Sequence, residues 1–413
     1  MSVDDLIRQN RTADVTVTLS AGGVPLANRQ VVVAQTNHKF LFGSTGFDFI
    51  PLANGDVQGA EKDEMELLAS EWLALFNFAT LPFYWGRFEP ERGKPDTKRT
   101  LAAARWFAAR GVNLKGHPLC WHTAQPAWLL PLSNEAILEA QKARTRREVT
   151  DFRGVIDTWD AINEAVIMPV FENGANGITR ICRANGRIAT VGMAFETARA
   201  ANPKAFLLLN DFDMSTAFEC LIEGVLEAGI KIDAIGLQSH MHQGYWGEEK
   251  TLKIIDRFAR YGLPIHFTET TILSGHLMPP EIVDLNDYQI PDWPTTPEGE
   301  ARQADEIVRH YKTLLSHPAV EAVTYWDLTD RGWLGAPAGM VRRDFSPKPS
   351  YDAMHALIKG EWWLAPTKMA TDAEGRFRFN GFLGDYEVSV EDRKAAFRLD
   401  RAGAAAVEVS LAG

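Results

Sequence analysis

The chain of 413 residues alternates short β-like runs with helical stretches, and this order restricts its possible folds more than any other feature. Strands separated by helices pair in parallel, and eight such units close into a barrel. The β-like runs are 40–44, 76–80, 112–121, 158–164, 206–211, 234–240, 265–269 and 322–327. The helical stretches between them are 61–74, 98–110, 133–149, 186–201, 216–228, 249–261 and 297–316. We therefore predict an α/β protein with a (β/α)8 TIM barrel over residues 37–365.

The two ends of the chain have a different pattern. Residues 13–36 alternate apolar and polar side chains around a Gly-Gly turn, and residues 370–411 do the same after a turn sequence at 371–375. Neither piece is long enough to bury a core alone. We therefore expect residues 1–36 and 366–413 to supply the strands of one small accessory β-sandwich.

Charge and composition exclude several classes of partner. The formal net charge is −11, which does not suit a protein that holds a polyphosphate backbone, so we expect no nucleic-acid partner. No apolar run is long enough to span a membrane, and the N-terminal sequence MSVDD has no apolar signal core. We expect a monomer that is either cytoplasmic or a secreted or periplasmic protein lacking its signal segment. The three cysteines have no metal-ligand spacing, and we expect no cofactor and no metal.

Polar residues stand at the ends of six of the eight predicted strands. The carboxyl ends of barrel strands meet at one face, where active sites form. Glu164 ends the run 158–164 and Glu269 ends the run 265–269, and two carboxylates that converge on one pocket are the usual means of breaking a glycosidic bond. The other polar tips are His117, Trp121, Asn163, Asn210, Asp211, Gln238, His240 and Trp326.

The expected chemistry is double displacement at an anomeric carbon. One carboxylate attacks the sugar and forms a glycosyl-enzyme intermediate, and the other protonates the departing oxygen and later activates water. The acid requires a raised pKa and the nucleophile must stay ionised. Asn163 is placed to bind the sugar 2-hydroxyl, a contact that strengthens in the transition state.

Six segments, in order, carry a resemblance to a known family. They are 116–122 (GHPLCWH), 159–165 (WDAINEA), 210–213 (NDFD), 232–240 (IDAIGLQSH), 268–269 (TE) and 347–351 (PKPSY). Over residues 37–360 the chain resembles the family 10 glycoside hydrolases, which are mostly endo-β-1,4-xylanases. The resemblance implies that Glu164 is the acid/base and Glu269 the nucleophile, and that a polysaccharide or oligosaccharide is the substrate. It further implies a substrate-binding set of His117, Trp121, Asn163, Gln238, His240, Trp326, Trp333 and Tyr84.

The chain departs from the family pattern on the donor side of the site. The stretch 81–85 (LPFYW) replaces the family segment PENEMKW, and Tyr84 stands where the lysine would be. Thr271 replaces an aspartate that orients His240, and Asp327 adds a carboxylate where the family has glycine. Loss of hydrogen bonds matched to hydroxyls weakens binding by about 0.5–1.5 kcal/mol each. The expected function is endo-1,4-β-xylanase action, and the alternative is the same retaining chemistry on a decorated xylan or a plant glycoside, which the aromatic patch 83–85 favours.

Two other classes remain open. A metal-dependent barrel hydrolase would use His117, His122, His240, His242 and Glu269 as ligands, and chelator treatment would abolish its activity. A catalytically inactive sugar-binding module would bind oligosaccharides without turnover. Inactive relatives of barrel enzymes usually lose a catalytic carboxylate, and this chain keeps both.

Overall fold

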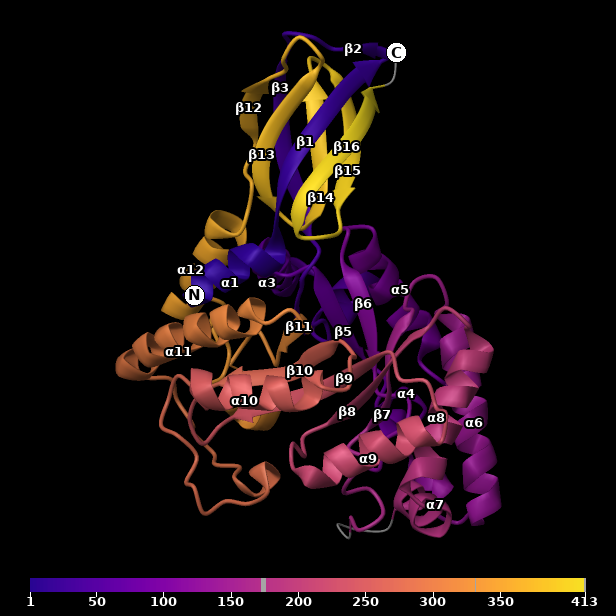
Figure 1. Ribbon diagram of the computed structural model, residues 1–413. Coiled ribbons are helices and arrows are strands. Elements are labelled where there is room, and N and C mark those ends of the chain that lie inside the picture. Colours follow the sequence, from indigo (N-terminus) through magenta and orange to yellow (C-terminus); the bar gives the residue numbers. More distant parts are fainter. Residues whose placement is uncertain (172–175, 331, 412–413) are drawn as a thin grey trace.

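The computed structural model describes residues 1–171, 176–330 and 332–411. Eight parallel strands close a barrel in the spatial order β10-β11-β4-β5-β6-β7-β8-β9 (Figure 1). The strands are β4 (Leu41–Thr45), β5 (Phe78–Pro82), β6 (Asn113–His117), β7 (Thr158–Asn163), β8 (Phe206–Asp211), β9 (Ala234–Met241), β10 (Ile265–Ile272) and β11 (Val320–Tyr325). The predicted (β/α)8 barrel is confirmed.

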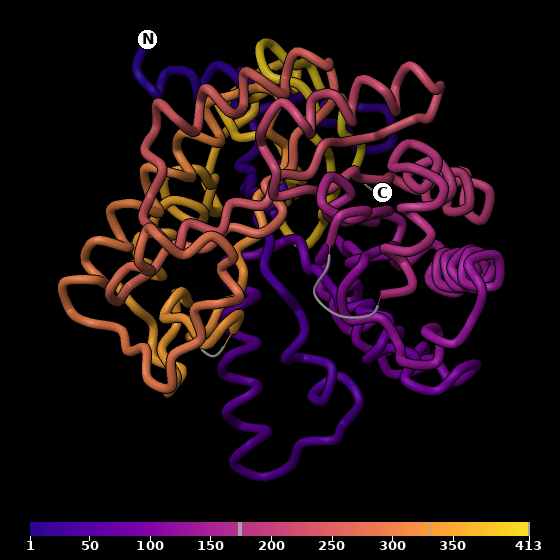
Figure 2. The backbone as a smooth tube through the Cα atoms, turned by 90° about the horizontal axis from the view of Figure 1, so that it is seen from below, coloured from indigo at the N-terminus to yellow at the C-terminus, as the bar shows by residue number. Residues whose placement is uncertain are grey.

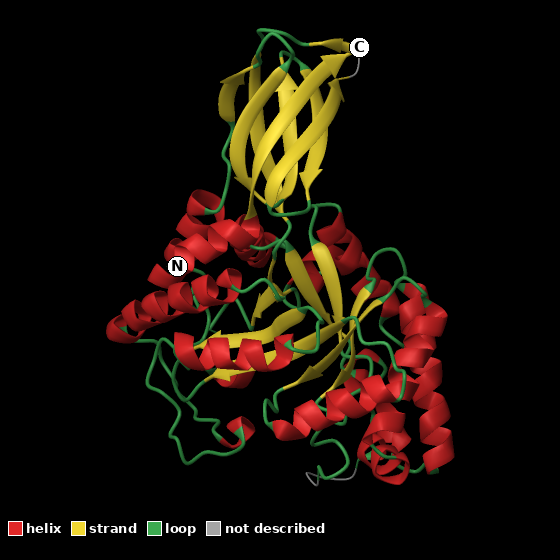
Figure 3. Cartoon of the chain, viewed as in Figure 1, coloured by secondary structure: helices red, strands yellow, loops and turns green. Residues whose placement is uncertain are grey.

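Helices surround these strands (Figure 3). The long helices are α3 (Gly59–Leu75), α5 (Thr97–Ala108), α6 (Asn134–Asp151), α8 (Arg187–Ala201), α9 (Thr216–Glu227), α10 (Glu248–Ala259) and α11 (Pro297–Ser316), one at each stretch that the sequence predicts. Shorter ones are α2 (Phe49–Asn54), α4 (Trp85–Phe88), α7 (Gly177–Asn185) and α12 (Pro349–Ala356). Local chemistry sets the helix starts: at α11 the Thr296 hydroxyl accepts a hydrogen bond from the Gly299 N–H at 3.0 Å, and Pro297 occupies the first turn.

The accessory domain is a sandwich of two four-stranded sheets. One sheet contains β1 (Thr12–Ala21), β2 (Val24–Pro25), β13 (Arg376–Phe382) and β16 (Gly403–Leu411), and the other contains β3 (Gln30–His38), β12 (Thr367–Ala370), β14 (Gly384–Val390) and β15 (Arg393–Leu399). Alternate residues of β1, including Val15, Val17 and Leu19, meet Phe377 and Phe397 in a separate core. The predicted sandwich from both chain ends is confirmed. Seen from below, it lies behind the barrel (Figure 2).

The first residues of the chain differ from the expectation that residues 1–36 supply strands. Val3–Arg11 forms helix α1, because Ser2 and Asp5 complete a capping box at its start. Ile7 is buried in the core of the barrel, and the Arg11 guanidinium donates hydrogen bonds to the carbonyls of Leu315, His317 and Val320. This segment therefore belongs to the amino-terminal end of the barrel, and the strands of the sandwich begin only at Thr12.

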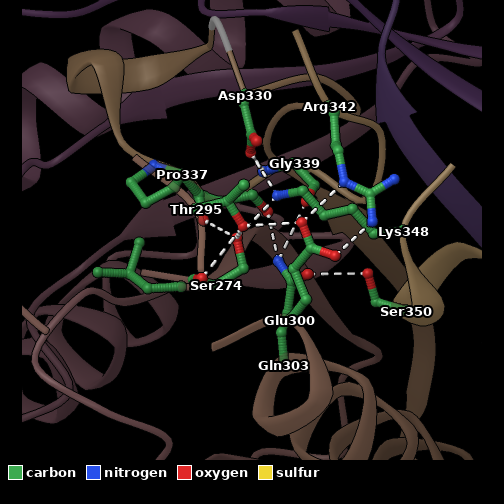
Figure 4. A network of polar contacts seen from close by, with 12 residues as sticks. Ser274, Thr295, Glu300, Gln303, Asp330, Pro337, Gly339, Arg342, Lys348 and Ser350 are labelled. Atoms are coloured by element: carbon green, nitrogen blue, oxygen red, sulfur yellow. Dashed lines mark hydrogen bonds and ion pairs between the residues drawn. The ribbon is translucent and has the colours of Figure 1, made fainter. Parts of the chain in front are cut away.

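A buried polar network holds the loops that follow β10 and β11 together (Figure 4). Lys348 is fully buried, and its Nζ contacts Asp330 Oδ1 at 2.6 Å and donates to Ser274 Oγ at 2.7 Å. The Gln303 amide donates to the carbonyls of Ile272, Ala338 and Gly339. The predicted long loop over 274–297 thus has fixed anchors, and it also has a small core of its own around Met278 and Trp293.

Candidate active site

The two glutamates are connected by side-chain amides at the carboxyl ends of the barrel strands. Asn163 donates from Nδ2 to Glu164 Oε1 at 3.0 Å. Asn210 donates from Nδ2 to Asn163 Oδ1 at 2.6 Å and lies 3.2 Å from Glu269 Oε1. Gln238 donates to the same oxygens of Asn163 and Glu164, at 3.1 and 3.2 Å. Residues that are distant in the sequence therefore meet in one network, as the polar strand tips predict.

Glu164 lies in a turn that directs its carboxyl group into this network. Its backbone has φ +57°, in the left-handed region that is uncommon outside glycine. Two hydrogen bonds fix the turn. The Glu164 N–H donates to the Asn210 carbonyl at 2.9 Å, and the Val166 N–H donates to Asp211 Oδ2 at 3.0 Å. Asp211, one of the predicted polar tips, therefore caps this turn with its carboxylate.

The surroundings of the Glu164 carboxyl group favour its protonated form. Trp121 donates from Nε1 to Oε2 at 2.8 Å, and His122 Nε2 lies 3.7 Å from the same oxygen. Burial raises the pKa of Glu164 to about 8 and the charge of Glu269 adds to the effect, which outweighs the hydrogen bonds from Trp121 and Gln238 that favour the ionised form. A carboxyl group with this pKa carries its proton at neutral pH, as a general acid must.

Glu269 has the opposite environment. His240 Nε2 lies 3.1 Å from Oε2, and His117 Nε2 lies 3.9 Å from Oε1. Burial alone would raise the pKa of Glu269, but His117, His240 and Lys115 together hold this pKa below its ordinary value. Glu269 is therefore ionised while Glu164 is protonated, which is the division of roles that a double displacement requires.

His117 and His240 are each fixed on the side away from Glu269. His240 Nδ1 lies 3.3 Å from Thr271 Oγ1, and the Trp333 ring stacks on His240 with ring centroids 4.1 Å apart. Among the predicted residues, the structure thus places Trp333 on the imidazole that touches Glu269. On the sequence alone, Thr271 is the residue expected to meet His240, and the contact is present.

A buried ion pair below His117 was missed by the sequence analysis. Asp160 on β7 accepts from His117 Nδ1 at 2.7 Å, and Lys115 Nζ lies 2.8 Å from the same oxygen. Lys115 and Asp160 are both fully buried. The geometry of the Lys115 ammonium group does not meet that of a hydrogen bond, so the two side chains form an ion pair. The signal available in the sequence was a charged residue inside each of two otherwise apolar strands.

The aromatic patch 83–85 divides between the site and the barrel wall. Phe83 is fully buried against Phe152 and Trp159, and Trp85 packs on Trp128. Tyr84 alone of the three meets site residues: its ring contacts His117 and Trp121, with centroids 5.6 and 5.7 Å apart. Of the three aromatic residues, only Tyr84 therefore supports an altered substrate.

All ten predicted site residues are linked by hydrogen bonds or ring contacts around Glu164 and Glu269. Trp326 joins the set through His117, with ring centroids 5.3 Å apart. Within residues 1–171, 176–330 and 332–411, no three histidine, cysteine, aspartate or glutamate side chains are arranged to hold a metal ion. In the same part of the chain, no helix combines the length and apolarity needed to cross a membrane.

A (β/α)8 barrel that carries one protonated and one ionised glutamate at its carboxyl-terminal face has the catalytic groups of a glycoside hydrolase. Residues 64–357 match the model of glycosyl hydrolase family 10, and the chain belongs to this family. It is therefore an O-glycosyl hydrolase, and the resemblance noted in the sequence is confirmed.

Individual relatives are distant. The chain is 27% identical to endo-1,4-beta-xylanase B of Thermotoga neapolitana over 290 residues, which cover 67% of this chain and 78% of that protein. It is 25% identical to anti-sigma-I factor RsgI6 of Acetivibrio thermocellus over 94% of this chain but only 46% of that protein. Xylanase 10B of Thermotoga petrophila, solved in complex with xylobiose, superposes with a TM-score of 0.63 at 21% identity and covers 78% of this chain and 95% of its own. The last match shows the fold alone.

Proposed function

We propose that the protein hydrolyses β-1,4-xylosidic bonds by a retaining double displacement, with Glu269 as nucleophile and Glu164 as acid/base. The observation that carries this proposal is the amide network that joins the two glutamates at the carboxyl ends of the strands. It is supported by the raised pKa of Glu164 and the lowered pKa of Glu269. The names of the related xylanases support xylose as the sugar.

The first step forms a covalent intermediate. A carboxylate oxygen of Glu269 attacks the anomeric carbon while Glu164 gives its proton to the departing glycosidic oxygen. The C–O bond to the leaving group breaks with its electron pair on that oxygen, and the sugar remains as an ester of Glu269. Asn163 and His117 line the position of this sugar and are suited to bind its hydroxyl groups.

The second step releases the sugar. Glu164, now ionised, takes a proton from water, and the water oxygen attacks the anomeric carbon and displaces Glu269. Two inversions leave the configuration unchanged. The Trp121 indole, which donates to Glu164 at 2.8 Å, holds the carboxyl group in position for both proton transfers.

A second candidate is the same chemistry on another β-glycoside. The contacts of Tyr84 with His117 and Trp121 favour it, because they put an aromatic ring where the family places a lysine. This candidate shares Glu164 and Glu269 and differs only in the sugar and its leaving group.

Chromatography with mass detection of the products from glucuronoarabinoxylan and xylo-oligosaccharides tests the proposal. Wild type should release xylose-containing products, and Glu269→Ala should release none. Glu248→Gln, at a partly exposed position on α10, is the control and should match wild type. Products from plant glycosides alone would favour the second candidate, and binding without turnover would indicate an inactive sugar-binding protein.

A 2-fluoro-xyloside with a good leaving group tests the nucleophile separately, because it traps the glycosyl-enzyme ester. Mass spectrometry of peptides should find the added sugar on Glu269. A label on another residue would contradict the assignment.

A further inference from the structure

A cavity lies between the barrel and the sandwich that stands on it (Figure 1). Its volume is about 450 Å³, within the range of pockets that hold small organic molecules. The sandwich lines it with residues 38–39, 382–383 and 400–402. Leu41 and Glu321, which also line it, stand at the first turns of strands β4 and β11, whereas the active site lies at the carboxyl ends of the same barrel strands. The cavity is therefore separate from the active site.

Arg11 brings a positive charge to the wall of this cavity. Its Nε and Nη2 donate hydrogen bonds to the backbone carbonyls of Leu315, His317 and Val320, which carry no net charge. Among the residues that the structure describes, Nη1 has no hydrogen-bond partner and no carboxylate forms an ion pair with Arg11. Burial lowers the pKa of Arg11 to about 10, and the charge of Glu321 opposes this only in part. The guanidinium therefore keeps N–H donors and an uncompensated charge for a ligand.

The other charged side chains around the cavity are mainly basic. Lys39 donates from Nζ to the backbone carbonyl of Asp400 at 2.7 Å, and the Asp400 carboxylate pairs with Arg398 instead. In a chain with a net charge of −11, a local excess of positive charge favours a negatively charged ligand. Four basic side chains and two carboxylates make up the charged lining: Arg11, Lys39, Arg398, Arg401, Asp400 and Glu321.

The rest of the lining is largely apolar. Phe40, Leu315 and Leu383 are buried, and Phe382 is half-buried beside them. The Phe40 ring lies against the Arg11 guanidinium, whose carbon atom is 5.1 Å from the ring centroid. Flat apolar walls beside a cation suit a ligand that combines a ring with one negative group.

We propose that this cavity binds a small carboxylate with an aromatic body. The carboxylate accepts hydrogen bonds from Arg11 Nη1 and from the Lys39 ammonium group, and the ring packs on Phe40 and Phe382. The bound anion compensates the charge of Arg11. Because the cavity is lined by both the barrel and the sandwich, the ligand also stabilises the folded arrangement of the two by mass action.

Isothermal titration of the full chain with benzoate tests the inference. Two matched probes separate the contributions of ring and charge: benzyl alcohol keeps the ring without the charge, and acetate keeps the charge without the ring. Benzoate should bind at least about 10-fold more tightly than either, because a hydrogen bond to a charged group and the burial of a ring each add to affinity. Absence of benzoate binding, or equal affinity for either of the other two probes, would overturn the inference.

Charge-changing variants test the role of Arg11. Arg11→Met should weaken benzoate binding on the order of 10- to 100-fold, the effect of losing a hydrogen bond to a charged group. Glu321→Gln should strengthen it by about 2- to 5-fold, because a nearby repelling charge is removed. Glu248→Gln, the same change on α10, should bind benzoate like wild type. Unchanged affinity in Glu321→Gln contradicts the inference whether or not Arg11→Met folds.

Three further variants locate the bound benzoate. Ala402→Trp puts a large side chain at the exposed edge of the cavity and should abolish binding, whereas Ala404→Trp, at an exposed position of β16, should not. Glu269→Ala should keep the wild-type affinity, because the active site lies at the opposite ends of the barrel strands. A changed affinity in Glu269→Ala, with none in Ala402→Trp, would place benzoate in the active site and overturn the inference.

Discussion

Asp160→Asn should destabilise the barrel far more than its conservative appearance suggests. Asp160 is fully buried and compensates the charge of Lys115, also fully buried, at 2.8 Å. Removing one partner of a buried ion pair leaves the other charge without compensation and costs about 3–5 kcal/mol. We therefore expect the free energy of unfolding to fall by that amount at neutral pH, because Lys115 and His117 keep the pKa of Asp160 below its ordinary value despite burial.

Urea unfolding followed by tryptophan fluorescence measures the loss. Asp63→Asn, on the exposed face of α3, is the matched control and should remain within about 0.5 kcal/mol of wild type. Lys115→Met combined with Asp160→Asn should recover most of the stability, because no buried charge then lacks a partner. A carboxylate with a lowered pKa stabilises the fold at pH values above its ordinary pKa of 3.8. The difference in unfolding free energy between wild type and Asp160→Asn should therefore shrink only as the pH falls below 3.8. A loss under about 1 kcal/mol, the value of an exposed pair, would refute the reasoning.

Three further predictions concern the site. The rate should fall as the pH rises above about 8, where Glu164 loses its proton, and should persist to acid pH because the pKa of Glu269 is lowered. Glu164→Gln should remove this fall at alkaline pH. It should also slow cleavage of unactivated substrates by about 10²–10⁴-fold, yet spare aryl glycosides with good leaving groups. Phe83→Ala should cost about 3–5 kcal/mol of stability, because this ring is fully buried, whereas Tyr84→Ala should chiefly raise KM; equal stability losses would contradict the separation. Incubation with a chelator should leave the rate unchanged, because two carboxylates complete the chemistry, and a loss that added metal restores would revive the metal-dependent class.

The candidate site was predictable to the extent that it depends on strand ends. Glu164 and Glu269 each follow an apolar run, and the geometry of a parallel barrel brings such ends to one face. The motif order then identified the family before any contact was known. Asp160 was not predictable in this way, because it stands inside a strand and only its neighbours give it a role.

The sequence by itself determined the eight strands, the helices between them and the two glutamates, because hydrophobic periodicity and turn residues act locally. The tertiary structure alone decided which terminal strands pair: β1 lies parallel to β16, at the other end of the chain, while Val3–Arg11 leaves the sandwich for the barrel. It also decided the different protonation of Glu164 and Glu269. Both are glutamates with the same ordinary pKa of 4.5, and their difference arises from burial and from the charges around each one, which only the folded chain assembles.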